Sequence, residues 1–89
     1  MTNKMTNGLP TPQEVYQVAV KNGHYKYNPT GFDEILGMAG ELLEINNAVV
    51  NKIPEGQPHC ESEECADLEI RLRSYCGRRG IDLDAAIKR

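Results

Sequence analysis

The sequence predicts an all-α fold, an antiparallel helical bundle completed by oligomerisation. Apolar residues recur at helical spacing, glycine and proline separate the helical segments, and no stretch alternates apolar and polar residues as a half-buried strand does. With 89 residues the chain makes one small domain. A core this thin usually needs a metal or a partner subunit to be stable.

The first helix follows a polar N-terminal leader. We assign residues 1–11 to the leader and residues 12–89 to a single helical domain. Thr11 is expected to cap this helix, because Pro12 suits the first helical position and Glu14 completes a capping box.

The second helix is expected from about residue 32 to about residue 50 and is apolar on two sides. One arc should pack within the chain (Ile35, Met38, Leu42, Ile45, Val49) and the other should pack on a partner subunit (Leu36, Ala39, Leu43, Val50). The sequence therefore predicts a homodimer or homotetramer.

The third helix is expected to begin at a Ser62 cap and to end near Arg78. Its apolar stripe would consist of Cys65, Leu68, Leu72 and Cys76. After Gly80, a short fourth helix should begin at Asp82.

Composition excludes several function classes. The net charge is −3 with no basic block, which argues against binding to duplex nucleic acid. No apolar run approaches the ~20 residues that span a bilayer, so no membrane partner is expected. Three cysteines and no signal peptide suit a reducing compartment, the cytoplasm, or the host cytoplasm if the protein is viral.

Two pairs of acidic residues carry the chemistry. Glu41 and Glu44 lie three apart on the second helix, and Glu64 and Asp67 repeat this spacing on the third. On facing antiparallel helices they would form a group of four carboxylates, which a divalent cation would stabilise. Oxygen ligands favour Mg²⁺, with Mn²⁺ as the alternative. The competing interpretation is a pair of helices with solvated acidic faces.

These residues resemble the MazG-like all-α nucleoside triphosphate pyrophosphohydrolases of phages and bacteria. The family signature is two glutamates one turn apart, followed by Glu-x-x-Asp on the next helix. Similar flanking sequences extend the resemblance over most of the chain: Tyr16, Gln17 and Ala19, then Leu36–Glu41, Ala66–Arg71 and Gly80–Leu83. The chain departs from the family at Gly40, where relatives often have another glutamate.

The resemblance implies Mg²⁺-dependent hydrolysis of a nucleoside or deoxynucleoside triphosphate to the monophosphate and pyrophosphate. Glu41, Glu44, Glu64 and Asp67 would hold the metal and serve catalysis. A related alternative is phosphoribosyl-ATP pyrophosphohydrolase. An alternative from another class is a catalytically silent helical module for dimerisation or binding.

Three further residues are candidates for substrate binding. Arg71 lies one turn beyond Asp67 and would reach a phosphate oxygen or form an i,i+4 ion pair with Asp67. Lys26 and Tyr27 lie in the loop before the acidic helix, where a tyrosine ring would stack on a base or cover the edge of the core. The spacing of His59 and the cysteines does not favour zinc.

Overall fold

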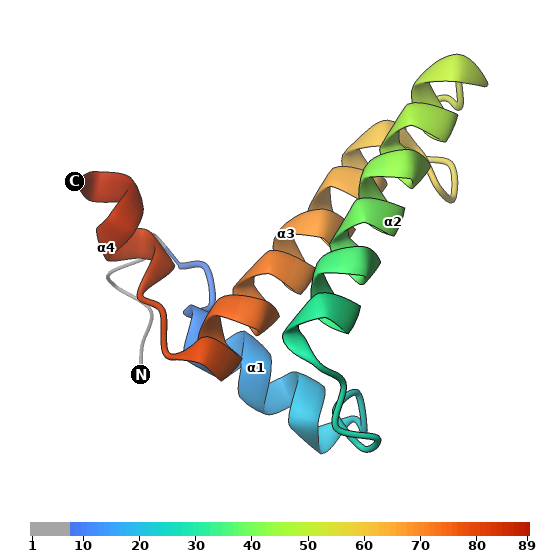
Figure 1. Ribbon diagram of the computed structural model, residues 1–89. Helices are drawn as coiled ribbons and strands as arrows, with labels where there is room; N and C mark the ends of the chain where they lie inside the picture. Colours follow the sequence, from blue (N-terminus) through green and yellow to red (C-terminus); the bar gives the residue numbers. More distant parts are fainter. Residues whose placement is uncertain (1–7) are drawn as a thin grey trace. The chain divides into compact units, whose positions relative to one another are not determined.

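The computed structural model describes residues 8–89, and within that range it is all-α, without a β-strand (Figure 1). This confirms the all-α part of the predicted fold class, while its completion by oligomerisation stays a prediction. None of these helices is long and apolar enough to cross a membrane. Most of the predicted leader, residues 1–7, lies outside the described residues. The helices are α1 (Pro12–Lys21), α2 (Gly31–Val50), α3 (Glu61–Arg79) and α4 (Leu83–Lys88).

The described chain divides into two compact units. We call residues 30–71 the hairpin unit, and residues 8–29 with 72–89 the terminal unit. Helix α3 contributes its first part to the hairpin unit and its last part to the terminal unit. Both acidic pairs therefore belong to the hairpin unit.

In the terminal unit, the end of α3 holds the two short helices. The predicted capping box of α1 is present: Thr11 Oγ1 accepts a hydrogen bond from the Glu14 amide at 3.2 Å, and Glu14 Oε1 accepts one from the Thr11 amide at 2.7 Å. Arg73 is buried and donates two hydrogen bonds, of 3.1 and 3.2 Å, to the carboxylate of Asp84 on α4. Helix α4 begins at Leu83, one residue after the predicted start at Asp82, and Asp82 caps it by accepting a hydrogen bond from the Ala85 amide.

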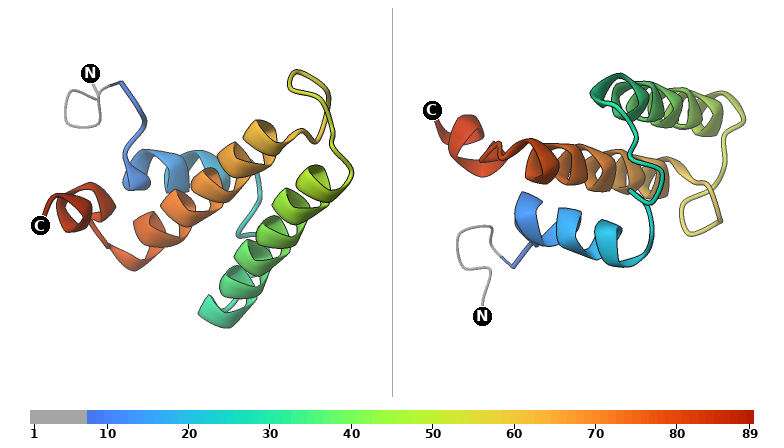
Figure 2. Two further views of the ribbon diagram at one scale, coloured as in Figure 1. Left: turned by 90° about the horizontal axis from the view of Figure 1, so that it is seen from above. Right: turned by 60° about the horizontal axis from the view of Figure 1, so that its bottom comes forward.

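In the hairpin unit, α2 and the first part of α3 run side by side in opposite directions (Figures 1 and 2). A capping box between Thr30 and Asp33 starts α2 at Gly31, and the connector after Val50 leads to α3. Hydrogen bonding in α3 begins when the Glu64 amide donates to the Cys60 carbonyl at 3.0 Å.

The Ser62 cap predicted for α3 is wrong. Ser62 lies inside the helix, and its hydroxyl donates a hydrogen bond of 2.6 Å to Glu55 Oε2 in the connector. The predicted apolar stripe of α3 also changes, because Cys65 is exposed while Cys76 is buried.

The face of α2 that becomes buried shares only Met38 and Ile45 with the arc predicted to pack within the chain. Glu34 and Ala48 are buried, and Met38, Glu41 and Ile45 between them are half-buried. These five residues follow the three- and four-residue spacing of one helix face. The large apolar residues of both predicted arcs are mostly exposed instead: Ile35, Leu36, Leu42, Leu43, Val49 and Val50.

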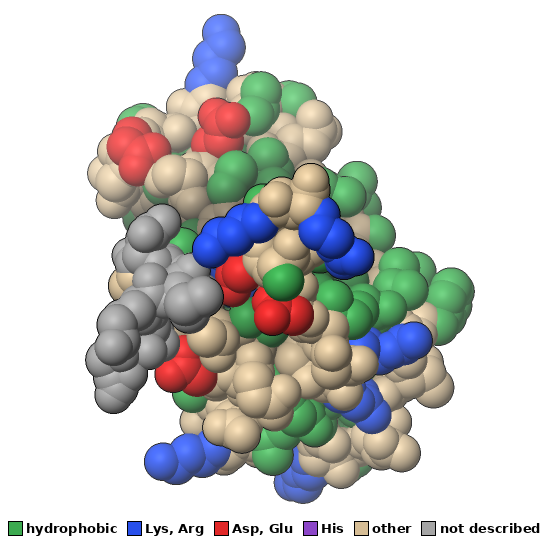
Figure 3. Space-filling view, turned by 90° about the vertical axis from the view of Figure 1, so that its left-hand side faces the viewer, with side chains coloured by type: hydrophobic (Ala, Val, Ile, Leu, Met, Phe, Trp, Pro, Cys, Tyr) green, Lys and Arg blue, Asp and Glu red, His purple; other side chains and the backbone are tan. Residues whose placement is uncertain are grey.

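The hydrophobic core of the described residues is correspondingly small. The buried apolar side chains there are small ones: Ala48, Cys60 and Cys76, together with Pro12 at the start of α1. Hydrophobic side chains appear among the polar ones at the surface in Figure 3. The expected packing of Ile35, Leu42 and Val49 within the chain is therefore wrong, since about half or more of each side chain remains accessible.

Candidate metal centre

Three of the four predicted carboxylates come together in the hairpin unit. One oxygen each of Glu41 on α2 and of Glu64 and Asp67 on α3 lie within 4.8 Å of one another. Glu64 is 3% exposed, and Glu41 is half-buried. The antiparallel arrangement explains this meeting, because it places the first turns of α3 beside the second half of α2.

The spacing and chemistry of these oxygens suit a small divalent cation. In octahedral Mg²⁺ coordination at about 2.1 Å, opposite ligands are roughly 4.2 Å apart. Adjacent ligands are roughly 3.0 Å apart, so oxygens that lie within 4.8 Å of one another can share one ion once the side chains move closer together. All three donors are hard oxygen ligands, the type that Mg²⁺ and Mn²⁺ prefer.

Arg71 forms an ion pair with one of these carboxylates. Its Nε donates a hydrogen bond of 2.7 Å to Glu41 Oε2, which links α3 to α2. The sequence suggested Asp67 as an alternative partner, one turn away on the same helix, whereas the observed ion pair is with Glu41. Without a metal, the three carboxylates and this one guanidinium leave two net negative charges.

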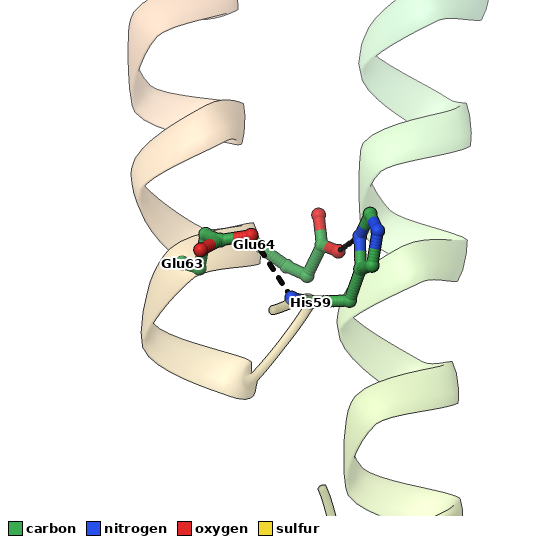
Figure 4. A group of neighbouring side chains, drawn as sticks. All are labelled: His59, Glu63 and Glu64. Carbon is green, nitrogen blue, oxygen red and sulfur yellow. Dashed lines mark hydrogen bonds and ion pairs between the residues drawn. The ribbon is translucent and has the colours of Figure 1, made fainter. Parts of the chain in front are cut away.

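His59 contacts the buried carboxylate of Glu64. Figure 4 shows the imidazole beside that carboxylate, with Nδ1 and Oε2 2.9 Å apart. The His59 amide also donates to Glu63 Oε1 at 2.9 Å, at the start of α3. The hydrogen bond to Glu64, followed by the charges of Glu64, Glu63 and Glu44, raises the pKa of His59 above its ordinary value.

Sequence reasoning missed this role of His59. The only available signal was its position five residues before Glu64, and a loop residue has no helical periodicity that would orient its side chain. His59 has a positive φ of 66°, a left-handed conformation that the sequence does not reveal. His59, Glu63 and Glu64 also form a group whose potential ligand atoms lie within 4.8 Å of one another.

Glu44 does not belong to the group of three carboxylates. It is exposed, one turn beyond Glu41 on α2, and its charge acts on His59. Lys26 and Tyr27 belong to the terminal unit, where the Lys26 ammonium lies 5.4 Å from the centre of the Tyr27 ring. The assignment of Glu44 to the metal, and of Lys26 and Tyr27 to the substrate, stays a prediction.

The small residues near the acids differ in their surroundings. A Cβ placed on Gly40 would have no neighbour within 4 Å, whereas one on Gly37 would lie 2.5 Å from Arg71 Nη1. Ala48 is buried, so it fills space in the helix packing. Of Gly37, Gly40 and Ala48, only Gly40 faces open space.

Comparisons with known proteins identify no relative of this chain. No protein-family model, no curated protein and no solved structure matches this chain.

Proposed function

We propose that this protein hydrolyses a nucleoside or deoxynucleoside triphosphate to the monophosphate and pyrophosphate with the help of Mg²⁺. The observation that supports the proposal most strongly is that one carboxylate oxygen each of Glu41, Glu64 and Asp67 lie within 4.8 Å of one another. The acidic signature that resembles the MazG-like pyrophosphohydrolases supports the choice of reaction.

Each residue has a role in this proposal. Glu41, Glu64 and Asp67 would hold the cation, which when bound polarises phosphoryl oxygens and lowers the pKa of a coordinated water. Glu44 is the best candidate to orient or deprotonate the attacking water, because it is exposed and stands at the edge of the group. Arg71 would donate hydrogen bonds to a phosphate oxygen.

Self-association is part of the same proposal. Leu36, Leu43 and Val50 recur every seven residues along α2 and are all more than half exposed. A seven-residue apolar repeat is typical of helices that pair along a seam. A second copy of the chain, presenting the same stripe, would cover this surface and enlarge the small core in a homodimer or homotetramer.

The test is incubation with each of the eight common nucleoside triphosphates and with phosphoribosyl-ATP, with and without Mg²⁺. We expect pyrophosphate to be released only with Mg²⁺, and to be lost in Glu41→Gln. Glu61→Gln is the matched control, since Glu61 is an exposed glutamate in the first turn of α3 outside the carboxylate group. Release of orthophosphate, or activity unchanged in Glu41→Gln, would overturn the proposal. Turnover of phosphoribosyl-ATP alone would identify the related family, and no turnover of any substrate would favour a binding module.

A further inference from the structure

Arg71 occupies a carboxylate that the proposed metal would need. Its Nε lies 2.7 Å from Glu41 Oε2, and Glu41 also belongs to the group of three carboxylates. A guanidinium at this distance lowers the affinity of the carboxylate for a second cation, because the two positive charges compete for the same oxygens. Metal binding at Glu41 and the Arg71 ion pair therefore oppose each other.

Gly37 makes room for this ion pair. It lies one turn before Glu41 on α2, and a Cβ there would stand 2.5 Å from Nη1 and 3.4 Å from Cζ of Arg71. Any side chain at this position would displace the guanidinium, which is the far end of a flexible side chain. Glycine is disfavoured within helices, so the space that Gly37 leaves for Arg71 offers a reason for its presence.

We propose that Arg71 is an exchangeable counter-cation. In the metal-free protein it neutralises Glu41, and it leaves Glu41 when a divalent cation binds there. The Arg71 side chain is 38% exposed, so its released guanidinium can turn toward solvent and toward an anionic ligand of that cation. This inference rests on the proposed function, because it assumes that Glu41 binds a metal.

Exchange predicts effects of opposite sign on two ligands. Removing the guanidinium should strengthen binding of the metal alone, because Glu41 is then free of competition. The same change should weaken binding of a phosphate anion to the metal-loaded protein, because a donor is lost. A purely structural role of Arg71 would weaken both, so the opposite signs identify the exchange.

The experiment measures Mn²⁺ binding by electron paramagnetic resonance and inorganic pyrophosphate binding to the Mn²⁺-loaded chain by calorimetry. Arg71→Gln should bind Mn²⁺ about two- to fivefold more tightly, the range expected for a partly exposed ion pair, and pyrophosphate more weakly. Gly37→Ala keeps the charge but displaces it, so it should also tighten Mn²⁺ binding. Gly40→Ala, the same change in open space on the same helix, should match the wild type.

The two failures are distinguishable. If the wild type binds Mn²⁺ and neither Arg71→Gln nor Gly37→Ala binds it more tightly, the exchange is refuted while the metal site stands. If the wild type and all variants bind no Mn²⁺, the metal site and the exchange both fail.

Discussion

Replacing Leu43 by glutamate tests the self-association surface of α2. Leu43 is 71% exposed, in the middle of the seven-residue repeat. Burying a leucine side chain is worth about 1.5–3 kcal/mol, so covering the exposed part would contribute about 1–2 kcal/mol in each copy. A symmetric dimer contains the residue twice, so the substitution should cost about 2–4 kcal/mol of association free energy. This corresponds to a dissociation constant that is roughly 30- to 1,000-fold larger. A buried glutamate carboxylate adds to this loss.

Sedimentation velocity over a dilution series measures the effect. Leu43→Glu should shift the association to higher concentration or abolish it. Ile87→Glu is the matched control, because Ile87 is 69% exposed but lies on α4 in the terminal unit. A wild type that stays monomeric at every concentration, or a Leu43→Glu variant that associates as the wild type does, would refute the reasoning.

Two further predictions concern stability and protonation. Gly77→Ala should lower the free energy of unfolding by about 1–3 kcal/mol, because the added Cβ would overlap the carbonyl oxygen of Pro12. Gly40→Ala, which adds a Cβ in open space, should be neutral or stabilising. Equal melting temperatures for the two variants would contradict this packing. NMR titration should place the pKa of His59 above its ordinary value of 6.5 in the wild type and nearer to 6.5 in Glu64→Gln. A His59 pKa that is the same in the variant as in the wild type would exclude Glu64 as the cause. Since the pKa of His59 is raised by folding, the stability that it contributes is fully present below pH 6.5 and is lost as the pH rises through the raised pKa.

Features that depend on neighbouring residues in the chain could be predicted from the sequence. The capping box of Thr11 and Glu14 and the start of a short last helix next to Asp82 follow from residue types at fixed offsets, and both are present. Ser62 has a residue type that suits a cap, yet it does not cap α3. Its hydroxyl donates to Glu55 in the connector, and the helix already begins at Glu61.

The face of α2 that packs on α3 could not be predicted from the sequence of α2 alone. Periodicity identified a helix with apolar residues on two sides, but it could not decide which side meets α3. The buried face contains Glu34 and Glu41 among its members, so hydrophobicity alone pointed to the wrong residues, Ile35 and Leu42.

The candidate site was predictable in its residue types but not in its pairing. Spacing along each helix identified the acids, and the antiparallel fold brings Glu41, Glu64 and Asp67 together. The ion pair of Arg71 with Glu41 joins residues thirty positions apart, so no local spacing rule could indicate it.

The most direct test of the account is metal binding by the carboxylate group itself. Calorimetric titration with Mg²⁺ and Mn²⁺ should show a saturable site in the wild type and in Glu61→Gln. Glu64→Gln and Asp67→Asn should each lose more affinity than the roughly 10–100-fold that substitution of an outer-shell partner costs. Binding in both variants equal to that of the wild type would contradict the account.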